Sequence, residues 1–142
     1  MDMSLLENCE GIEEHCRVEL DSHADTCCSG RNTVLLEETT RKVNVRSFTP
    51  EHNSLDDILI GSCGGAYDCT ETGETYLLVW HESLYFGDRL PVTLVNPNQV
   101  RAAGHRVNDC PTQFDQESSH SIITSCNLKI KLKMSGIISY FQ

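Results

Sequence analysis

Two carboxylates lie within one short run of small residues. The hexapeptide at positions 21–26 reads Asp-Ser-His-Ala-Asp-Thr and follows the alternating segment 16–21, which is typical of a half-buried strand. An acid at the end of such a strand can supply one half of a carboxyl pair. Two carboxyls about 3 Å apart cannot both ionise, so one acts as a base towards water and the other as an acid towards a substrate carbonyl. The structural alternative is an Asx turn, in which Asp21 only bonds nearby backbone.

Other chemistries fit the residue spacing less well. Ser22 is interpreted as support for the turn and not as a nucleophile, because no histidine–acid pair stands beside it at an interpretable spacing. The eight cysteines and six histidines do not form the paired patterns of a zinc site, so we predict free thiols, no metal and no cofactor. A thiol-rich metal-binding module stays open as a third alternative. The cysteines are Cys9, Cys16, Cys27, Cys28, Cys63, Cys69, Cys110 and Cys126.

The elements that position the hexapeptide follow a period of two. We expect a long hairpin from residues 42–48 and 57–66, a second hairpin that turns at 71–74, and strands at 92–95, 128–133 and 137–141. Glu37-Glu38 is interpreted as a turn, and residues 108–121 as a polar surface excursion. Asn96 as N-cap, Pro97 at the first helical position and Gly104 as a stop predict one short helix. The fold class is therefore mostly β, of sandwich or barrel type, with one short α-helix.

Composition limits the classes of partner. The 142 residues include 11 Lys plus Arg and 21 Asp plus Glu, a formal net charge of −10. This charge argues against nucleic acid as a partner. No apolar run reaches the roughly 18 residues that a membrane helix needs, and the acidic start does not resemble a signal peptide. We therefore predict an intracellular, cytoplasmic protein without a membrane partner. It comprises an N-terminal segment, residues 1–13, and one domain, residues 14–142.

Several motifs together resemble a known family. Residues 21–26 are similar to the Asp-[Ser/Thr]-Gly-Ala active-site signature of retropepsin-like aspartic proteases in all but the third position. Residues 94–100, Leu-Val-Asn-Pro-Asn-Gln-Val, followed by Gly104, resemble the strand and helix that close that fold. More closely, the chain resembles the protease segment of Gag-Pol polyproteins of copia-type LTR retrotransposons. That similarity spans roughly residues 14–141 and includes 84–86, 109–111, 117–122 and 136–141.

The resemblance implies a closed β-barrel or sandwich of the acid-protease type and a homodimeric aspartic endopeptidase. Its substrate would be a polypeptide, the retroelement polyprotein, and each chain would lend Asp21 across a two-fold axis. The apolar closing strand, residues 137–141, would form an exposed edge at the dimer interface. The implied active-site loop is Ser22, His23, Ala24, Asp25 and Thr26, in which Asp25 either shapes the substrate-side wall or is a solvated turn acid. The implied substrate-covering flap includes Phe48, Thr49, Pro50, Asn53 and Ser54.

Two positions depart from the family pattern. His23 replaces the motif glycine, and Asn96 stands where a second glycine is expected. An imidazole at position 23 can crowd a dimer mate or hold Asp21 ionised, or it can point outward without effect. A catalytically inactive dimerisation or peptide-binding module is therefore the alternative function. Outside the motif, Trp80 and His81 are assigned to the core and its rim. Lys129, Lys131 and Lys133 are assigned to one face of a strand, usually solvated.

Overall fold

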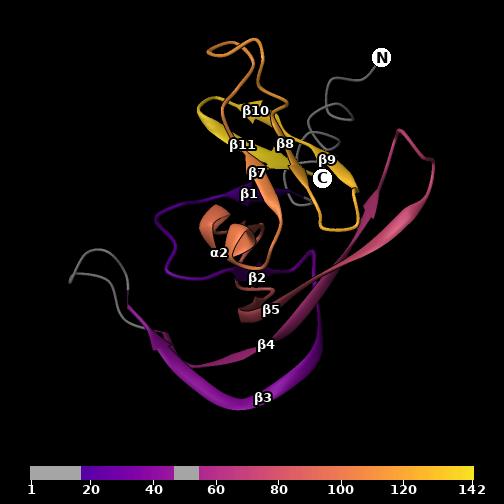
Figure 1. Ribbon diagram of the computed structural model, residues 1–142. Helices are drawn as coiled ribbons and strands as arrows, with labels where there is room; N and C mark the ends of the chain where they lie inside the picture. Colours follow the sequence, from indigo (N-terminus) through magenta and orange to yellow (C-terminus); the bar gives the residue numbers. More distant parts are fainter. Residues whose placement is uncertain (1–16, 47–54) are drawn as a thin grey trace, which may run out of the picture.

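Two β-sheets and one short helix make up the computed structural model, which describes residues 17–46 and 55–142 (Figure 1). The larger sheet has eight strands in the order β10-β11-β1-β6-β2-β5-β4-β3, and the smaller has the order β7-β8-β9. Strands of the larger sheet are β1 (Val18–Leu20), β2 (Cys28–Gly30), β3 (Val34–Val45), β4 (Leu55–Asp68), β5 (Thr75–Gly87), β6 (Thr93–Val95), β10 (Lys133–Ser135) and β11 (Ile138–Phe141). The smaller sheet contains β7 (Arg106–Asn108), β8 (Ser121–Ile123) and β9 (Lys129–Lys131).

The mostly-β prediction is confirmed, but the closed barrel is not. In the part of the chain that the structure describes, the larger sheet stays open, with β10 at one edge and β3 at the other. Closure would require hydrogen bonds between these two edges, and β3 pairs only with β4. Within the same ranges, no helix is long and apolar enough to cross a membrane.

Both predicted hairpins are present. β3 and β4 pair antiparallel from Val34↔Gly64 to Val45↔Leu55, and the turn between them lies outside the described residues. β4 and β5 pair from Leu59↔Tyr85 to Asp68↔Thr75, around the expected turn at residues 71–74. The turn predicted at Glu37-Glu38 is wrong, because both residues belong to β3 and pair with Ser62 and Gly61. Both side chains are exposed to solvent, so the strand accommodates two adjacent glutamates without burying a charge.

The predicted helix is present as α2 (Pro97–Ala102). The Asn96 side chain accepts hydrogen bonds from the backbone nitrogens of Asn98 and Gln99, and Pro97 occupies the first turn. Gly104 follows with φ +94°, a left-handed conformation that favours glycine at a helix end. The capping signals in the sequence therefore located this element correctly.

The C-terminal strands differ from the prediction in two ways. Residues 128–133 do not form one strand, because the segment breaks at Leu132, whose backbone N–H donates to the His120 carbonyl at 2.9 Å. Lys129 and Lys131 therefore lie in the smaller sheet and Lys133 in the larger one, not on one shared face. β11 is not an edge strand either, since it pairs with β10 on one side and β1 on the other.

The core lies where the two sheets approach each other. It contains Val18 and Val95 from the larger sheet, Ile122 and Ile130 from the smaller, and Phe141 from the closing strand. The polar excursion predicted for residues 108–121 is mostly exposed, as expected, but ends in buried residues. Ser118, His120 and Ser121 are each less than 10% exposed and return the chain to the core.

Candidate active site

Asp21 lies at the carboxyl end of β1, beside the carboxyl end of β6. These two strands run parallel with the register Leu20↔Val95, so Asp21 and Asn96 are the next residues on neighbouring strands. The Asp21 backbone N–H donates to the Val95 carbonyl at 3.0 Å. This bond extends the hydrogen bonding between β1 and β6 by one residue and so fixes the backbone position from which the Asp21 side chain projects.

The Asp21 carboxylate is half-buried and only partly engaged. Its Oδ1 accepts a hydrogen bond from the His23 backbone N–H at 2.9 Å, which is the Asx turn that the structural alternative predicted. Among the described residues no ion pair neutralises Asp21. The Asx turn orients one oxygen and leaves the second one for chemistry, so the turn and a catalytic role are compatible.

Asn96 holds the loop from the helix side. Its Nδ2 donates to the Ala24 carbonyl at 2.6 Å, while its Oδ1 accepts from the Asn98 backbone N–H at 2.8 Å. One side chain therefore caps α2 and ties the Asp21 loop to the cap. Asn96 itself has φ −77° and ψ 119°, an extended conformation that does not require the glycine expected at this position.

Gln99, one turn further along α2, holds the end of the loop. Its Oε1 accepts from the Cys27 backbone N–H at 2.9 Å and lies 3.1 Å from the Thr26 hydroxyl. The same hydroxyl lies 3.0 Å from the Glu82 carbonyl on β5. The loop is therefore fixed at its start by β6, in its middle by the helix cap Asn96 and at its end by Gln99 of α2. The role of Gln99 could not be predicted from the sequence, because it depends on a contact between residues that are 72 positions apart in the chain.

A buried polar network lies behind the loop. The Ser29 and Ser83 hydroxyls are 2.6 Å apart, and Trp80 donates its indole N–H to Ser29 at 2.7 Å. Both serines are fully buried, so each needs these partners. Trp80 packs against the core and His81 is exposed, as the sequence predicted for core and rim.

Cysteine thiols flank the acid. The six described cysteines are free. Burial, followed by the nearby charges of Cys27, Asp21 and Asp25, raises the pKa of Cys28 to about 11. The thiol beside the candidate acid is therefore protonated near neutral pH.

The remaining loop residues face solvent. Ser22, His23 and Asp25 are exposed. Among the described residues the Ser22 hydroxyl makes no hydrogen bond, and the contacts that hold the loop there come from Asp21, Asn96 and Gln99. Asp25 keeps the position of a solvated turn acid. Among the described residues, the non-glycine positions with positive φ are Asp57, Glu82, His120 and Asn127, so the backbone at His23 does not demand a glycine.

Two expectations concern residues or groups beyond this loop. The predicted flap residues Phe48, Thr49, Pro50, Asn53 and Ser54, and the boundary at residues 13 and 14, lie outside the described residues. Within the described ranges, no group of three His, Cys, Asp or Glu side chains is arranged to hold a metal ion.

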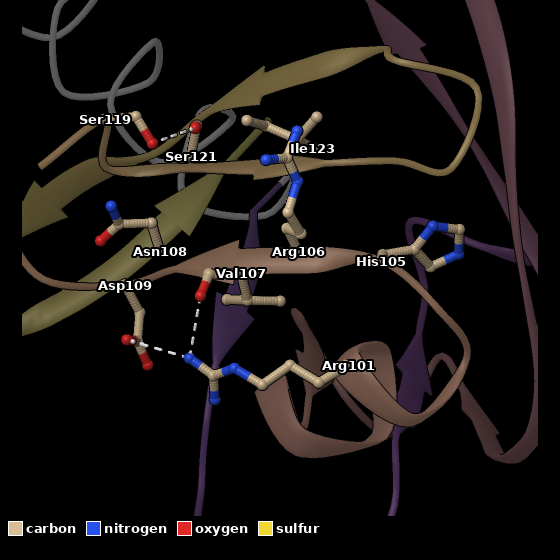
Figure 2. Close-up of a pocket in the computed structure, with 9 residues that line it drawn as sticks. All are labelled: Arg101, His105, Arg106, Val107, Asn108, Asp109, Ser119, Ser121 and Ile123. Carbon is tan, nitrogen blue, oxygen red and sulfur yellow. Dashed lines mark hydrogen bonds and ion pairs between the residues drawn. The ribbon is translucent and has the colours of Figure 1, made fainter.

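Asp21 does not line either of two cavities formed by the described residues. One, of about 630 Å³, lies between β5, α2 and the β8–β9 hairpin and has a largely apolar wall that includes Trp80, Val100 and Leu128. The other, of about 600 Å³, lies around β7 and is lined mostly by residues of polar type (Figure 2). In the part of the chain that the structure describes, Asp21 therefore lies on a half-exposed loop outside these two cavities.

No family model, no curated protein and no solved structure matches the chain.

Proposed function

We propose that the chain is a homodimeric aspartic endopeptidase, similar to the protease of copia-type LTR retrotransposon polyproteins. The observation that carries the proposal is the half-exposed Asp21 carboxylate, free of ion pairs in the described structure. It sits on a loop held by two side chains of the α2 segment, Asn96 and Gln99. A fixed but uncompensated carboxylate is what acid–base chemistry on water requires.

The order of elements supports the proposal. Strand β1, the acid-bearing loop, the long β3–β4 hairpin, strand β6 and helix α2 follow one another as the resemblance implies. Each chain supplies one such loop, so a carboxyl pair needs a second copy. Because β11 has strands on both sides, the apolar closing segment is available to a second copy mainly at the β10–β11 turn. There Ile137 is 95% and Ile138 41% exposed.

The proposed reaction is hydrolysis of a peptide bond. The ionised Asp21 of one chain takes a proton from water as the water oxygen attacks the carbonyl carbon. The protonated Asp21 of the other chain gives its proton to the carbonyl oxygen. Collapse of the tetrahedral intermediate breaks the C–N bond: the Asp21 that took the water proton gives it to the leaving nitrogen, and the other Asp21 takes back a hydroxyl proton as the carboxylic acid product forms. The two carboxyls share one proton, so the titration belongs to the pair.

His23 favours one alternative, an inactive dimerisation or peptide-binding module. Its exposed imidazole is two residues from Asp21, so a second chain that packed against this loop would meet it. An imidazole inserted between the two acids would hold both ionised and prevent proton sharing.

The test is cleavage of an unfolded protein substrate by the full chain, from acid to neutral pH, with the oligomeric state measured by sedimentation. We expect a dimer whose activity is blocked by a statine-type peptide. Activity should fall to background in Asp21→Asn and remain in the matched variant Asp25→Asn. Unchanged cleavage by Asp21→Asn removes Asp21 from the mechanism. A dimer that binds the statine peptide without cleaving substrate, but gains activity in His23→Gly, supports the alternative module.

A further inference from the structure

The cavity of about 600 Å³ around β7 has no role in the proposed proteolysis. Its lining includes Arg101, Arg106, Asn108, Asp109 and Ser119. Figure 2 shows Arg106 extending from β7 beside Ile123 of β8, while Arg101 approaches from α2 and reaches Asp109 and the Val107 carbonyl. The two arginines therefore have different surroundings within one cavity.

The Arg101 guanidinium contacts three protein groups. It donates to the Asn98 side chain at 2.9 Å and to the Val107 carbonyl at 3.0 Å, and it pairs with Asp109 at 3.3 Å. Arg101 thus neutralises the one carboxylate that lines the cavity. The Val107 carbonyl points away from β8, at the open edge of β7, and already accepts the hydrogen bond from Arg101. A peptide added as a further strand would need this carbonyl as an acceptor, so strand addition at β7 is disfavoured.

Arg106 is a cation without a protein partner. In the described part of the chain its guanidinium makes no ion pair and no hydrogen bond, on a protein whose net charge is −10. The register pairs Arg106 with Ile123, and Ile123 in turn with Lys129. Residues directly opposite across strands share a face, so Arg106 and Lys129 flank Ile123 at a separation of roughly two strand spacings, about 10 Å between their backbones. Two long basic side chains can converge on one anion over that distance.

Neutral donors lie on the same face. Asn108 pairs with Ser121 in the next row of the register. The Asn108 Oδ1 accepts from the Ser118 hydroxyl at 2.8 Å, so its two amide N–H donors have no partner among the described residues. The Ser119 and Ser121 hydroxyls are 2.8 Å apart, and only one of them donates to the other, which leaves a second O–H.

We propose that this cavity binds a phosphoryl group, with Arg106 as its main ligand and Asn108 and Ser119 as further donors from the lining. Lys129 does not line the cavity but would approach the same anion from the neighbouring strand β9. A guanidinium fork pairs with two oxygens of a phosphate, and the amide and hydroxyl donors suit its remaining oxygens. The same group can arrive as inorganic phosphate or on a phosphorylated serine side chain, and the experiment separates these sources.

The test follows the backbone amide resonances of residues 106, 108, 121 and 123 during titration of the full chain at constant ionic strength. Inorganic phosphate is one titrant, and a short phosphoserine peptide and its unphosphorylated counterpart are the others; sodium chloride controls for screening. We expect saturable shifts with phosphate or the phosphoserine peptide and none with the serine peptide. The stronger of the two phosphoryl ligands identifies the source.

Three variants distinguish specific binding in the cavity from non-specific attraction of an anion to any positive charge. Arg106→Gln should weaken binding by about tenfold or more, as expected for loss of a charge-assisted hydrogen bond, and Lys129→Gln should weaken it less. Lys133→Gln removes the same charge from the other sheet and should leave the affinity unchanged. Because Arg106 is exposed, its variant should unfold at the same urea concentration as the wild type. The absence of saturable shifts, or equal weakening by all three variants, overturns the proposal.

Discussion

The side-chain oxygen of Gln99 on α2 lies 2.9 Å from the backbone nitrogen of Cys27, and this bond closes the loop that begins at Asp21. Cys27 is only 2% exposed, so its N–H has no access to water as a substitute acceptor. The position of the candidate catalytic acid therefore depends on a neutral amide that the sequence motif does not contain.

Gln99→Ala should destabilise the chain by about 1–3 kcal/mol, the usual cost of a buried donor left without a partner. Urea unfolding followed by the fluorescence of Trp80, the single tryptophan, measures this change. Hydrogen exchange at the Cys27 amide should also become faster. Gln116→Ala, in an exposed loop, is the matched control and should stay within about 0.5 kcal/mol of the wild type. Equal unfolding midpoints for the two variants would show that the Gln99 bond does not hold the loop.

Gly30 is the position at which the larger sheet is most crowded by backbone. A Cβ atom there would lie 2.3 Å from the Val92 carbonyl oxygen and 2.5 Å from that of Leu90. These atoms belong to the segment between β5 and β6 and cannot move without shifting it. Gly30→Ala should therefore cost about 3 kcal/mol or more, at the upper end of the range for overpacking.

Gly65 in β4 provides the control for this substitution. A Cβ atom there meets its nearest neighbour, the Asn32 carbonyl oxygen, at 3.5 Å, and the backbone has no positive φ. Gly65→Ala should leave the free energy of unfolding unchanged or raise it slightly, because alanine reduces the entropy of the unfolded chain. Comparable losses in both variants, measured by urea unfolding, would contradict the crowding at Gly30.

The sequence predicted those elements whose signals are local. Asn96, Pro97 and Gly104 located α2, and the apolar alternation located both hairpins and the closing strand. The motif also predicted the Asx turn at Asp21. Each of these features depends on residues within a few positions of one another.

The failures concern contacts between distant segments. Period-two alternation at residues 128–133 does not reveal that Lys131 pairs in one sheet and Lys133 in another, because both halves have the same pattern. The edge position expected for residues 137–141 failed for the same reason, since the strand's own sequence does not show that it pairs with β1 at the other end of the chain. The loop support by Gln99 is a tertiary contact of this kind.

The cysteines should differ sharply in reactivity. Cys28 is half-buried and its pKa is raised to about 11, chiefly by burial, so at pH 7.5 roughly one molecule in three thousand carries the thiolate. The exposed Cys126 has a lowered pKa, because the Thr124 hydroxyl and the Leu128 backbone N–H stabilise its thiolate. Iodoacetamide at pH 7.5 should therefore label Cys126 well before Cys28, as read from peptide-resolved mass spectrometry.

The Thr124 hydroxyl supplies a matched pair of variants. Thr124→Ser retains the group that lies 3.1 Å from the Cys126 sulfur, and Thr124→Val removes it. The rate of Cys126 labelling should stay the same in the first variant and fall in the second. In urea the order of reactivity between Cys28 and Cys126 should disappear. Labelling of Cys28 at the rate of Cys126 in the folded protein would be incompatible with the burial described.

His120 should make stability depend on pH. It is 7% exposed, and its Nε2 lies 3.0 Å from the Ser139 hydroxyl of β11. Burial lowers its pKa below the ordinary value of 6.5, although the charge of Asp109 acts in the opposite direction. The unfolded state therefore takes up a proton before the folded state does. The stabilising contribution of uncharged His120 is complete above about pH 6.5 and is lost as the pH falls through 6.5 towards the lower folded-state pKa.

Two variants isolate this titration from that of the carboxylates. His120→Asn keeps a residue that tolerates φ of +41° but removes the ionisable ring. The difference in free energy of unfolding between wild type and His120→Asn should be constant above about pH 7 and should shrink towards pH 5. Ser139→Ala removes the hydroxyl but leaves the imidazole, so its pH dependence should follow that of the wild type at a lower overall stability. A wild-type advantage over His120→Asn that stays constant or widens on acidification would mean that the buried imidazole does not titrate as its burial requires.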